Sequence, residues 1–194
     1  MPPRRYRQNR RAESAEETRR RIVEATFALH DEQGIAATSM KQIAERAEVS
    51  VGTVYHHFPT YEDAVVACGQ HTADTIPPPT AEIFTGLADT AARIERLVAE
   101  LFGFYARLPV LERVRCDQHL MPVLRRFIDE ERQNRRALFE IALGSGATPQ
   151  QVDVAIALTD PAVHSALTHA NWSTDDSARE VARTLTLALA HPPY

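Results

Sequence analysis

Residues 39–58 read SMKQIAERAEVSVGTVYHHF, and this stretch decides the fold. Ser39, followed three positions later by Gln42, forms a capping box, which predicts the start of a short helix. Ser50 predicts the cap of a second short helix that runs to about His57. The stretch therefore predicts two short helices joined by about three residues.

A longer helix is predicted before this pair. Ser14 and Glu17 form another capping box, and the apolar periodicity that follows ends at Gly34. The periodic positions are Ile22, Val23, Thr26, Phe27 and Leu29. Residues 1–13 lack this periodicity, so we expect them to form a flexible, arginine-rich arm. Residues 14–60 are then expected to form a three-helix, helix-turn-helix domain.

Helical periodicity continues through residues 61–194. Thr60 predicts the cap of a fourth helix, Thr148 with Gln151 forms one more capping box, and Asp160-Pro161 predicts a break. We find no strand pattern and no internal repeat in the sequence. The expected fold is all-α, with the amino-terminal three-helix domain followed by a larger helical domain over residues 61–194.

Charge is distributed unevenly along the chain. The net charge is −4, yet residues 1–21 carry eight arginines against three glutamates, and residues 59–194 carry twelve arginines against eighteen acids. A basic amino-terminal segment on an otherwise acidic chain is typical of a protein that contacts nucleic acid through one segment. A solvated basic tail is the alternative.

The chain shows no sign of a membrane or secreted protein. No apolar run reaches the roughly 18 residues that span a bilayer, and no signal-peptide pattern opens the sequence, so we expect a cytoplasmic protein with no membrane partner. Cys68 and Cys116 lie far apart in helical patterns. They are interpreted as reduced structural thiols, with redox sensing as the alternative.

Motifs of catalysis and metal binding are missing from the sequence. It contains no glycine-rich phosphate loop, no G-x-S-x-G, no H-E-x-x-H and no paired C-x-x-C. His164 and His169 are five residues apart, and no carboxylate or cysteine is placed with them to complete a metal site. We therefore expect no enzyme activity, no cofactor and no metal.

The run RRRIVEATFALHDEQGIAATSMKQIAERAEVSVGTVYHHFPTYEDAVVA resembles the amino-terminal domain of TetR-type (TetR/AcrR) transcriptional regulators over about residues 15–70. The likeness lies in the helix lengths, the glycine that closes the first helix and the GTVYHHF stretch. The rest of the chain matches only in helix order and in the paired final helices. The resemblance implies a homodimer, expected to be a repressor, that binds a palindromic double-stranded DNA operator. A small-molecule effector in the carboxy-terminal ligand-binding and dimerisation domain would release it.

The second helix of the pair has the properties of a recognition helix. Its first residues are small or slim, as entry into a major groove requires, and Gly52 allows a close backbone approach. Thr53 offers a hydroxyl and a methyl to base edges or phosphates, whereas Val54 and Phe58 are interpreted as core residues. By resemblance, Lys41 takes a position that often reaches a base. The candidate DNA contacts are Arg4, Arg5, Arg10, Arg11, Ser39, Lys41, Ser50, Val51, Gly52, Thr53, Tyr55, His56, His57 and Tyr61.

Three residues depart from the family pattern. Glu48 stands where the turn usually has glycine, and a left-handed backbone there costs a non-glycine residue about 1 kcal/mol. Val51 and Tyr61 stand where basic residues are often found. The hairpin keeps two basic residues, Lys41 and Arg46, so we expect the arginine-rich arm to supply the missing phosphate contacts. A helical interaction protein that has lost specific DNA binding is the alternative.

The larger domain offers candidates for an effector site and a dimer interface. Aromatic and polar residues spread over its helices could line a mostly apolar pocket, although a stripe at helical spacing normally packs in a core. The candidates are Phe102, Tyr105, Cys116, His119, Phe127, His164 and Trp172. Apolar residues of the last helix, Val181, Leu185, Leu187 and Leu189, predict a four-helix dimer interface built from residues 149–170 and 175–190.

Overall fold

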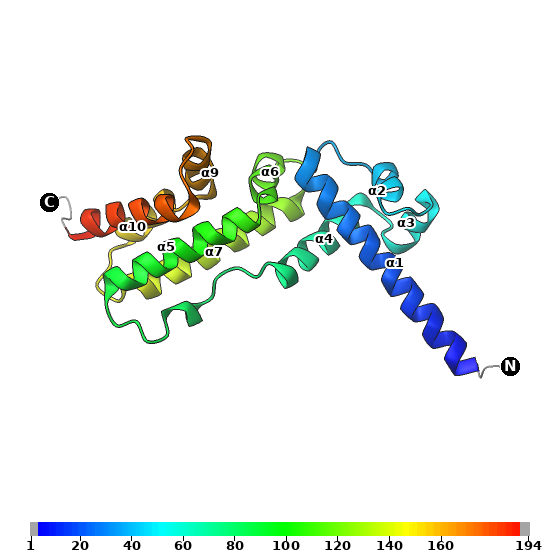
Figure 1. Ribbon diagram of the computed structural model, residues 1–194, viewed down its shortest axis with the longest axis horizontal. Coiled ribbons are helices and arrows are strands. Elements are labelled where there is room, and N and C mark those ends of the chain that lie inside the picture. Colours follow the sequence, from blue (N-terminus) through cyan, green and yellow to red (C-terminus); the bar gives the residue numbers. More distant parts are fainter. Residues whose placement is uncertain (1–3, 191–194) are drawn as a thin grey trace. The chain divides into compact units, whose positions relative to one another are not determined.

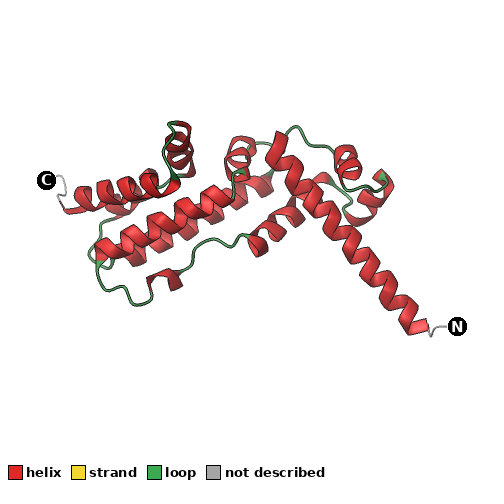
Figure 2. Ribbon diagram, viewed as in Figure 1, coloured by secondary structure: helices red, strands yellow, loops and turns green. Residues whose placement is uncertain are grey.

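The computed structural model describes the backbone of residues 4–190 and the side chains of residues 12–189. Every regular element in that part of the chain is helical, as Figure 2 shows. The elements are α1 (Arg4–Gln33), α2 (Met40–Arg46), α3 (Val51–His57), α4 (Tyr61–Thr75), the 3-10 turn η1 (Ala81–Phe84), α5 (Thr90–Arg107), α6 (Val110–Asp117), α7 (Pro122–Leu143), α8 (Pro149–Leu158), α9 (Pro161–His169) and α10 (Thr174–Ala190). The all-α class expected from the sequence is confirmed.

The chain divides into two compact units between Thr75 and Ile76. The first unit contains α1 to α4, and the second contains η1 and α5 to α10 (Figure 1). The sequence analysis placed the boundary at residue 60, before α4. In the structure α4 packs against α1, so its residues belong with the first unit.

The start of α1 differs from the expectation. The helix begins at Arg4, so residues 4–13 are helical rather than a flexible arm. Ser14 lies inside the helix and caps nothing: its carbonyl accepts a hydrogen bond from the Thr18 hydroxyl at 2.8 Å. The segment lacks apolar periodicity but holds five arginines, one alanine, one glutamine and one glutamate, residue types that all favour helix. Propensity therefore extends the helix beyond its packed part.

The core of the first unit comes from all four helices. Gly34, at φ 89, ends α1 as expected, and the chain then turns back into α2. The core residues lie on the inner faces of the helices, and they are Ile22, Val23, Ala25, Leu29, Met40, Ile43, Ala44, Ala47, Val54, Phe58 and Ala64. Burial of these side chains provides most of the stability that such short helices need.

Apart from Ser14, the predicted capping residues at helix starts are confirmed. Ser39 and Thr148 both form complete capping boxes, and the Ser50 side chain accepts from the Thr53 amide. The Thr60 hydroxyl accepts from the Asp63 amide at 3.1 Å at the start of α4. The predicted break at residues 160–161 separates α8 from α9.

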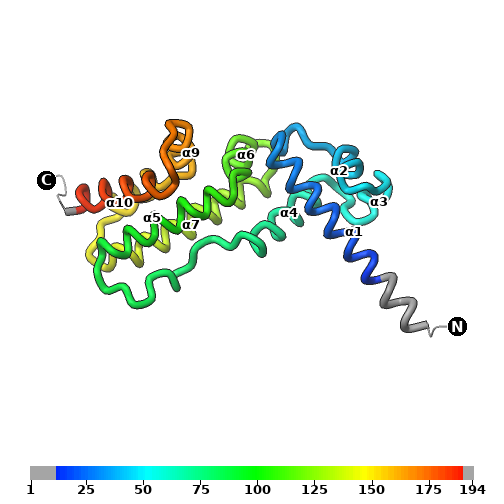
Figure 3. Tube along the Cα trace, viewed as in Figure 1, coloured from blue at the N-terminus to red at the C-terminus, as the bar shows by residue number. Residues whose placement is uncertain are grey.

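The second unit is built on α5. This helix packs against α7 and α10, and α7 also contacts α8 (Figure 3). The buried face of α5 consists of Ile94, Leu97, Val98, Leu101, Phe102, Phe104 and Tyr105. From α10, Val181 and Leu185 are buried within their own chain. They therefore do not supply the free apolar surface expected for a dimer, whereas Leu187 is exposed.

Candidate functional site

The turn between α2 and α3 is tight and ends α2 in a Schellman motif. The Val49 amide donates to the Ala44 carbonyl at 3.0 Å, and the Glu48 amide donates to the Glu45 carbonyl at 3.2 Å. Glu48 has a φ of 55, in the left-handed region that favours glycine. The strained non-glycine residue expected at this position is confirmed.

The two faces of α3 have different roles. Val54 is fully buried and Phe58, which follows the helix, is 3% exposed, so both belong to the core as expected. On the other side, Tyr55 is 50% exposed and Val51 is 39% exposed, and Gly52 and His56 are exposed with them. A short helix with an apolar and aromatic outer face is suited to contact another molecule.

Hydroxyl groups at the starts of α2 and α3 are occupied by capping bonds. Ser50 Oγ lies 2.8 Å from Thr53 Oγ1 and accepts from the Thr53 amide at 3.0 Å. The Ser39 hydroxyl donates to Gln42 Oε1 at 2.7 Å. Thr53 is half-buried, and its hydroxyl lies beside Ser50 at the amino end of α3. These hydrogen bonds fix the amino-terminal ends of α2 and α3.

The basic side chains of the hairpin are both paired. Arg46 holds Glu32 of α1 through two hydrogen bonds, Nη1 to Oε1 at 2.8 Å and Nη2 to Oε2 at 2.6 Å. These bonds to Arg46 lower the pKa of the Glu32 carboxyl. Lys41 makes a longer contact with Glu45 at 3.8 Å, and 77% of its side chain is exposed. Lys41 is therefore the more accessible cation of the two.

The arginines of α1 that the structure describes also have partners. Arg20 pairs with Glu17 at 2.7 Å and with Glu24 at 2.8 Å. The Arg21 guanidinium donates to the Ala47 carbonyl. Arg19 lies over the Phe58 ring, with its guanidinium carbon 5.1 Å from the ring centre. The side chains of Arg4, Arg5, Arg10 and Arg11 lie outside those described.

Tyr61 occupies an inner position. Its hydroxyl donates to the Ile35 carbonyl at 2.8 Å and lies 2.9 Å from His30 Nε2. Because the Tyr61 proton goes to Ile35, His30 Nε2 must carry the proton of the second bond, and His30 Nδ1 is left to accept from the Cys68 thiol at 3.8 Å. Burial raises the pKa of that thiol to about 12, which suits a structural cysteine. Tyr61 thus holds α4 against α1.

His57, another candidate DNA contact, is half-buried. Burial and the neighbouring charges of His56 and Arg19 lower its pKa, against a smaller opposing effect of Glu16. His57 is therefore neutral near pH 7 and acts as a hydrogen-bonding group rather than as a cation.

In the second unit, three ligand candidates come together. Tyr105 and His164 line a cleft of about 350 Å³ formed by α5, α6, α9 and the start of α10. Phe102 lies behind them, fully buried, with its ring centre 5.1 Å from that of His164 in a T-shaped arrangement. His164 Nε2 is buried and has no hydrogen-bond partner in the part of the chain that the structure describes. Phe102 is thus a core residue, and Tyr105 and His164 face the cleft.

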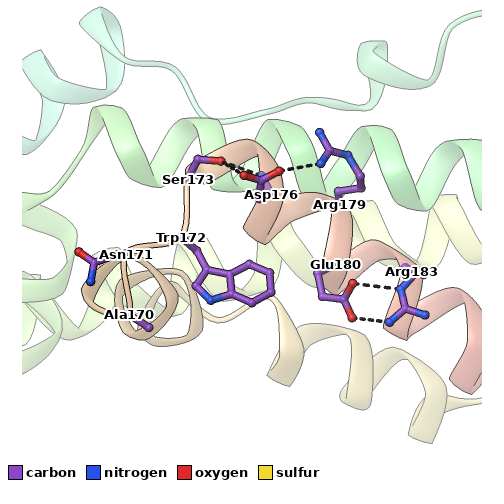
Figure 4. A pocket seen from close by; sticks show the side chains of 8 residues that line it. All are labelled: Ala170, Asn171, Trp172, Ser173, Asp176, Arg179, Glu180 and Arg183. Carbon is purple, nitrogen blue, oxygen red and sulfur yellow. Dashed lines mark hydrogen bonds and ion pairs between the residues drawn. The ribbon is translucent and has the colours of Figure 1, made fainter.

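The other ligand candidates lie elsewhere. Trp172 lines a separate open cleft at the turn from α9 into α10, beside the ion pairs of Asp176 with Arg179 and of Glu180 with Arg183 (Figure 4). Cys116 and His119 are exposed near the end of α6, and Phe127 is half-buried on α7 under Arg126. These residues do not form one site with His164.

Sequence reasoning missed a buried polar network that supports the His164 cleft. Arg135 of α7 is 2% exposed, and its guanidinium donates to the Thr159 carbonyl at 2.9 Å and to the Tyr105 hydroxyl oxygen at 3.2 Å. Asp160 lies 3.4 Å from Arg135 and 2.9 Å from Arg115. An arginine at an otherwise apolar helix position is the sole sequence signal of this network.

The described residues contain neither a candidate membrane span nor a candidate metal cluster. No helix in that part of the chain is long and apolar enough to cross a membrane. No group of three or more histidine, cysteine, aspartate or glutamate residues there has the geometry of a metal site.

Comparisons with known proteins agree with this geometry. The family model described as bacterial regulatory proteins, tetR family, matches residues 22–68. The HTH-type transcriptional repressor KstR of Mycobacterium tuberculosis is 26% identical over 182 residues, which cover 92% of this chain and 81% of that protein. KstR of Mycolicibacterium smegmatis is 45% identical over 49 residues, which cover 25% of this chain and 24% of that protein.

Solved structures share the fold. A TetR-like transcriptional regulator from Rhodococcus sp. RHA1 has a TM-score of 0.71 at 20% identity, over 89% of this chain and 96% of that one. The multidrug binding protein EbrR, complexed with imidazole, has a TM-score of 0.59 at 23% identity, over 87% and 89% of the two chains. The fold, the matched family model and the relatives together support a transcriptional regulator, not an enzyme. Residues 22–68 match the tetR family of bacterial regulatory proteins, and most of the chain is similar to a transcriptional repressor and shares the fold of a TetR-like regulator.

Proposed function

We propose that the protein is a repressor that binds a palindromic DNA operator as a homodimer and releases it when a small molecule enters the second unit. The observation that carries the proposal is the outer face of α3, where Tyr55 and Val51 are exposed beside Gly52. A major groove about 12 Å wide accepts such a helix, and the missing side chain at Gly52 allows close approach.

Several residues of the helix-turn-helix have an expected role in the complex. Tyr55 and His56 donate to phosphates, and Lys41 and Thr53 contact base edges. Tyr61 is left out, because its hydroxyl is bonded inside the first unit. The remaining phosphate charge comes from the arginines at the start of α1, because Arg46 is held by Glu32.

The homodimer and the effector rest on separate observations. Val154 of α8 is 45% exposed and Leu187 of α10 is 51% exposed, which favours a partner on this part of the second unit. A palindromic operator then follows from the two-fold symmetry of a homodimer. Support for an effector comes from the cleft at His164 and from EbrR, a structural neighbour described as a multidrug binding protein.

Selection of bound fragments from genomic DNA, followed by fluorescence anisotropy on the enriched sequence, tests this function. Tyr55→Ala and Thr53→Ala should weaken binding while circular dichroism remains unchanged. Val66→Ala serves as a matched control, because Val66 is 40% exposed on α4. If no fragment is enriched at low salt, or if both variants bind as the wild type does, the helical interaction protein is the better reading.

A further inference from the structure

The cleft between α5, α6 and α9 has the size and walls of a small-molecule site. Its volume of about 350 Å³ lies at the lower end of the range for such sites. Its apolar wall is made by Ala106, Leu108, Pro109, Leu111 and Pro161. A compact apolar body therefore fits it.

Two buried polar atoms of residues that line this cleft lack a hydrogen-bond partner among the described residues, Glu112 Oε2 and His164 Nε2. Glu112 Oε2 still has an ion-pair partner, Arg115 Nε at 3.6 Å, whereas His164 Nε2 has no charged partner there. His164 is 8% exposed, and its Nε2 is buried without a hydrogen bond. The neighbouring hydroxyls are occupied: Tyr105 donates to the Thr159 carbonyl at 3.2 Å, and Thr168 donates to the His164 carbonyl at 3.0 Å. An unpaired buried nitrogen is unfavourable, and a hydrogen bond from an occupant of the cleft would offset that cost.

The charges around the cleft select against anions. None of the described residues that line it is lysine or arginine, and Glu112 contributes a carboxylate. Burial lowers the pKa of His164, so its ring is uncharged near pH 7. A carboxylate or phosphate ligand would lose water without gaining a cation.

We propose that this cleft binds a small uncharged molecule, an apolar body with one hydroxyl or carbonyl group, whose polar group pairs with His164 Nε2. A neutral imidazole nitrogen either accepts from a hydroxyl or donates to a carbonyl, according to its tautomer. The proposal deepens the proposed function, since this molecule would be of the effector's class.

Four small aromatic probes of similar shape directly test the chemical class of the proposed ligand. Benzyl alcohol, toluene, benzylamine and benzoate share a ring and differ in the polar group. Their binding to the full chain is measured by saturation-transfer NMR, and the ¹⁵N shift of His164 Nε2 is followed in the same titrations. We expect benzyl alcohol to bind about threefold to tenfold more tightly than toluene, the factor that one hydrogen bond provides, and to move the His164 signal. Benzoate should bind most weakly.

Two variants locate the site. His164→Phe should keep toluene binding and lose the preference for the alcohol. Ala106→Phe fills the cleft from an exposed position, so it should abolish binding of every probe and leave circular dichroism unchanged. Trp172→Phe, in the other cleft, is the matched control. It should change neither toluene binding nor the preference for the alcohol.

The outcomes separate this inference from the proposed function. Equal binding of the alcohol and toluene, a preference for benzoate, or no binding at all would overturn the inference. DNA binding is measured on the same samples by anisotropy with the selected fragments. Alcohol binding at His164 without any DNA binding would preserve the site and defeat the repressor function.

Discussion

Arg46 of α2 and Glu32 of α1 form a two-point ion pair, with nitrogen-to-oxygen distances of 2.8 and 2.6 Å. The pair joins the helix-turn-helix to α1 and occupies one of the two basic side chains of the hairpin. Because both donors of this fork face Glu32, we expect Arg46 to contribute little to phosphate neutralisation.

Lys41 and Arg46 should therefore respond differently to substitution. Lys41→Ala should weaken operator binding, by about 1–3 kcal/mol at one operator position if Lys41 contacts a base. Arg46→Ala should leave the salt dependence of binding unchanged. Anisotropy titrations at several salt concentrations measure both. An Arg46→Ala variant with a clearly shallower salt slope would show that Arg46 leaves Glu32 when DNA binds.

Glu48→Gly should stabilise the first unit. The left-handed backbone costs Glu48 about 1 kcal/mol, part of which is offset by the greater freedom of glycine in the unfolded chain. We expect the free energy of unfolding to rise by about 0.5 kcal/mol in urea denaturation. Glu48→Ala is the control, because it removes the contact with Arg21 at 3.7 Å but keeps the strain. Equal stabilities of the two variants would contradict the argument.

The exposed apolar residues of α8 and α10 should maintain the dimer. Val154→Glu combined with Leu187→Glu should convert the protein to a monomer in analytical ultracentrifugation, because buried unpaired carboxylates oppose association. Val66→Glu places the same charge on α4 and should leave the dimer intact. Truncation after residue 171 also removes α10, but it uncovers α5 as well. A dimer that survives the double substitution would place the interface elsewhere.

Acidification should destabilise the protein partly through His164. Its folded pKa is lowered by burial, so below the unfolded value of about 6.5 the unfolded chain binds a proton that the folded chain does not. The free energy of unfolding should fall as the pH decreases through about 6.5. Between pH 7 and pH 5, the free energy of unfolding should decline less steeply in His164→Phe than in the wild type. His119→Gln changes an exposed position and should follow the wild-type decline. Parallel pH profiles for the wild type and the two variants would show that His164 does not cause the decline.

Features specified by neighbouring residues were predictable from the sequence. The capping residues Ser39, Ser50 and Thr148 act within three positions of themselves, and Glu48 was recognisable from its place in the turn. The predicted start of α1 was wrong, because apolar periodicity marks the packed part of a helix and does not detect the extension over residues 4–13 that helix propensity favours.

Features that depend on distant residues were not predictable. The cleft at His164 requires α6 and α9 to pack beside the end of α5, and Arg135 meets Tyr105 only after α7 has packed on α5. None of these contacts follows from spacing along the chain. Trp172 and His164 are close in sequence but line different clefts, because the chain turns between α9 and α10 at Asn171, where φ is 64.

We propose that the amino-terminal arginines, and not the hairpin, supply most of the phosphate-neutralising charge. Deletion of residues 2–11 removes five arginines and leaves the packed part of α1 in place. A second variant, with the same five arginines changed to glutamine, keeps the length of the helix and removes only the charge. Both variants should fold as the wild type does.

The most direct measurement is operator affinity as a function of salt for the full chain and for both variants. If three arginines in each half of a dimer meet phosphates, the slope of log affinity against log salt should become shallower by about 5 in both variants. Parallel lines for the three proteins would contradict the account, because they would show that the hairpin binds DNA with Lys41 and the polar groups of α3 alone.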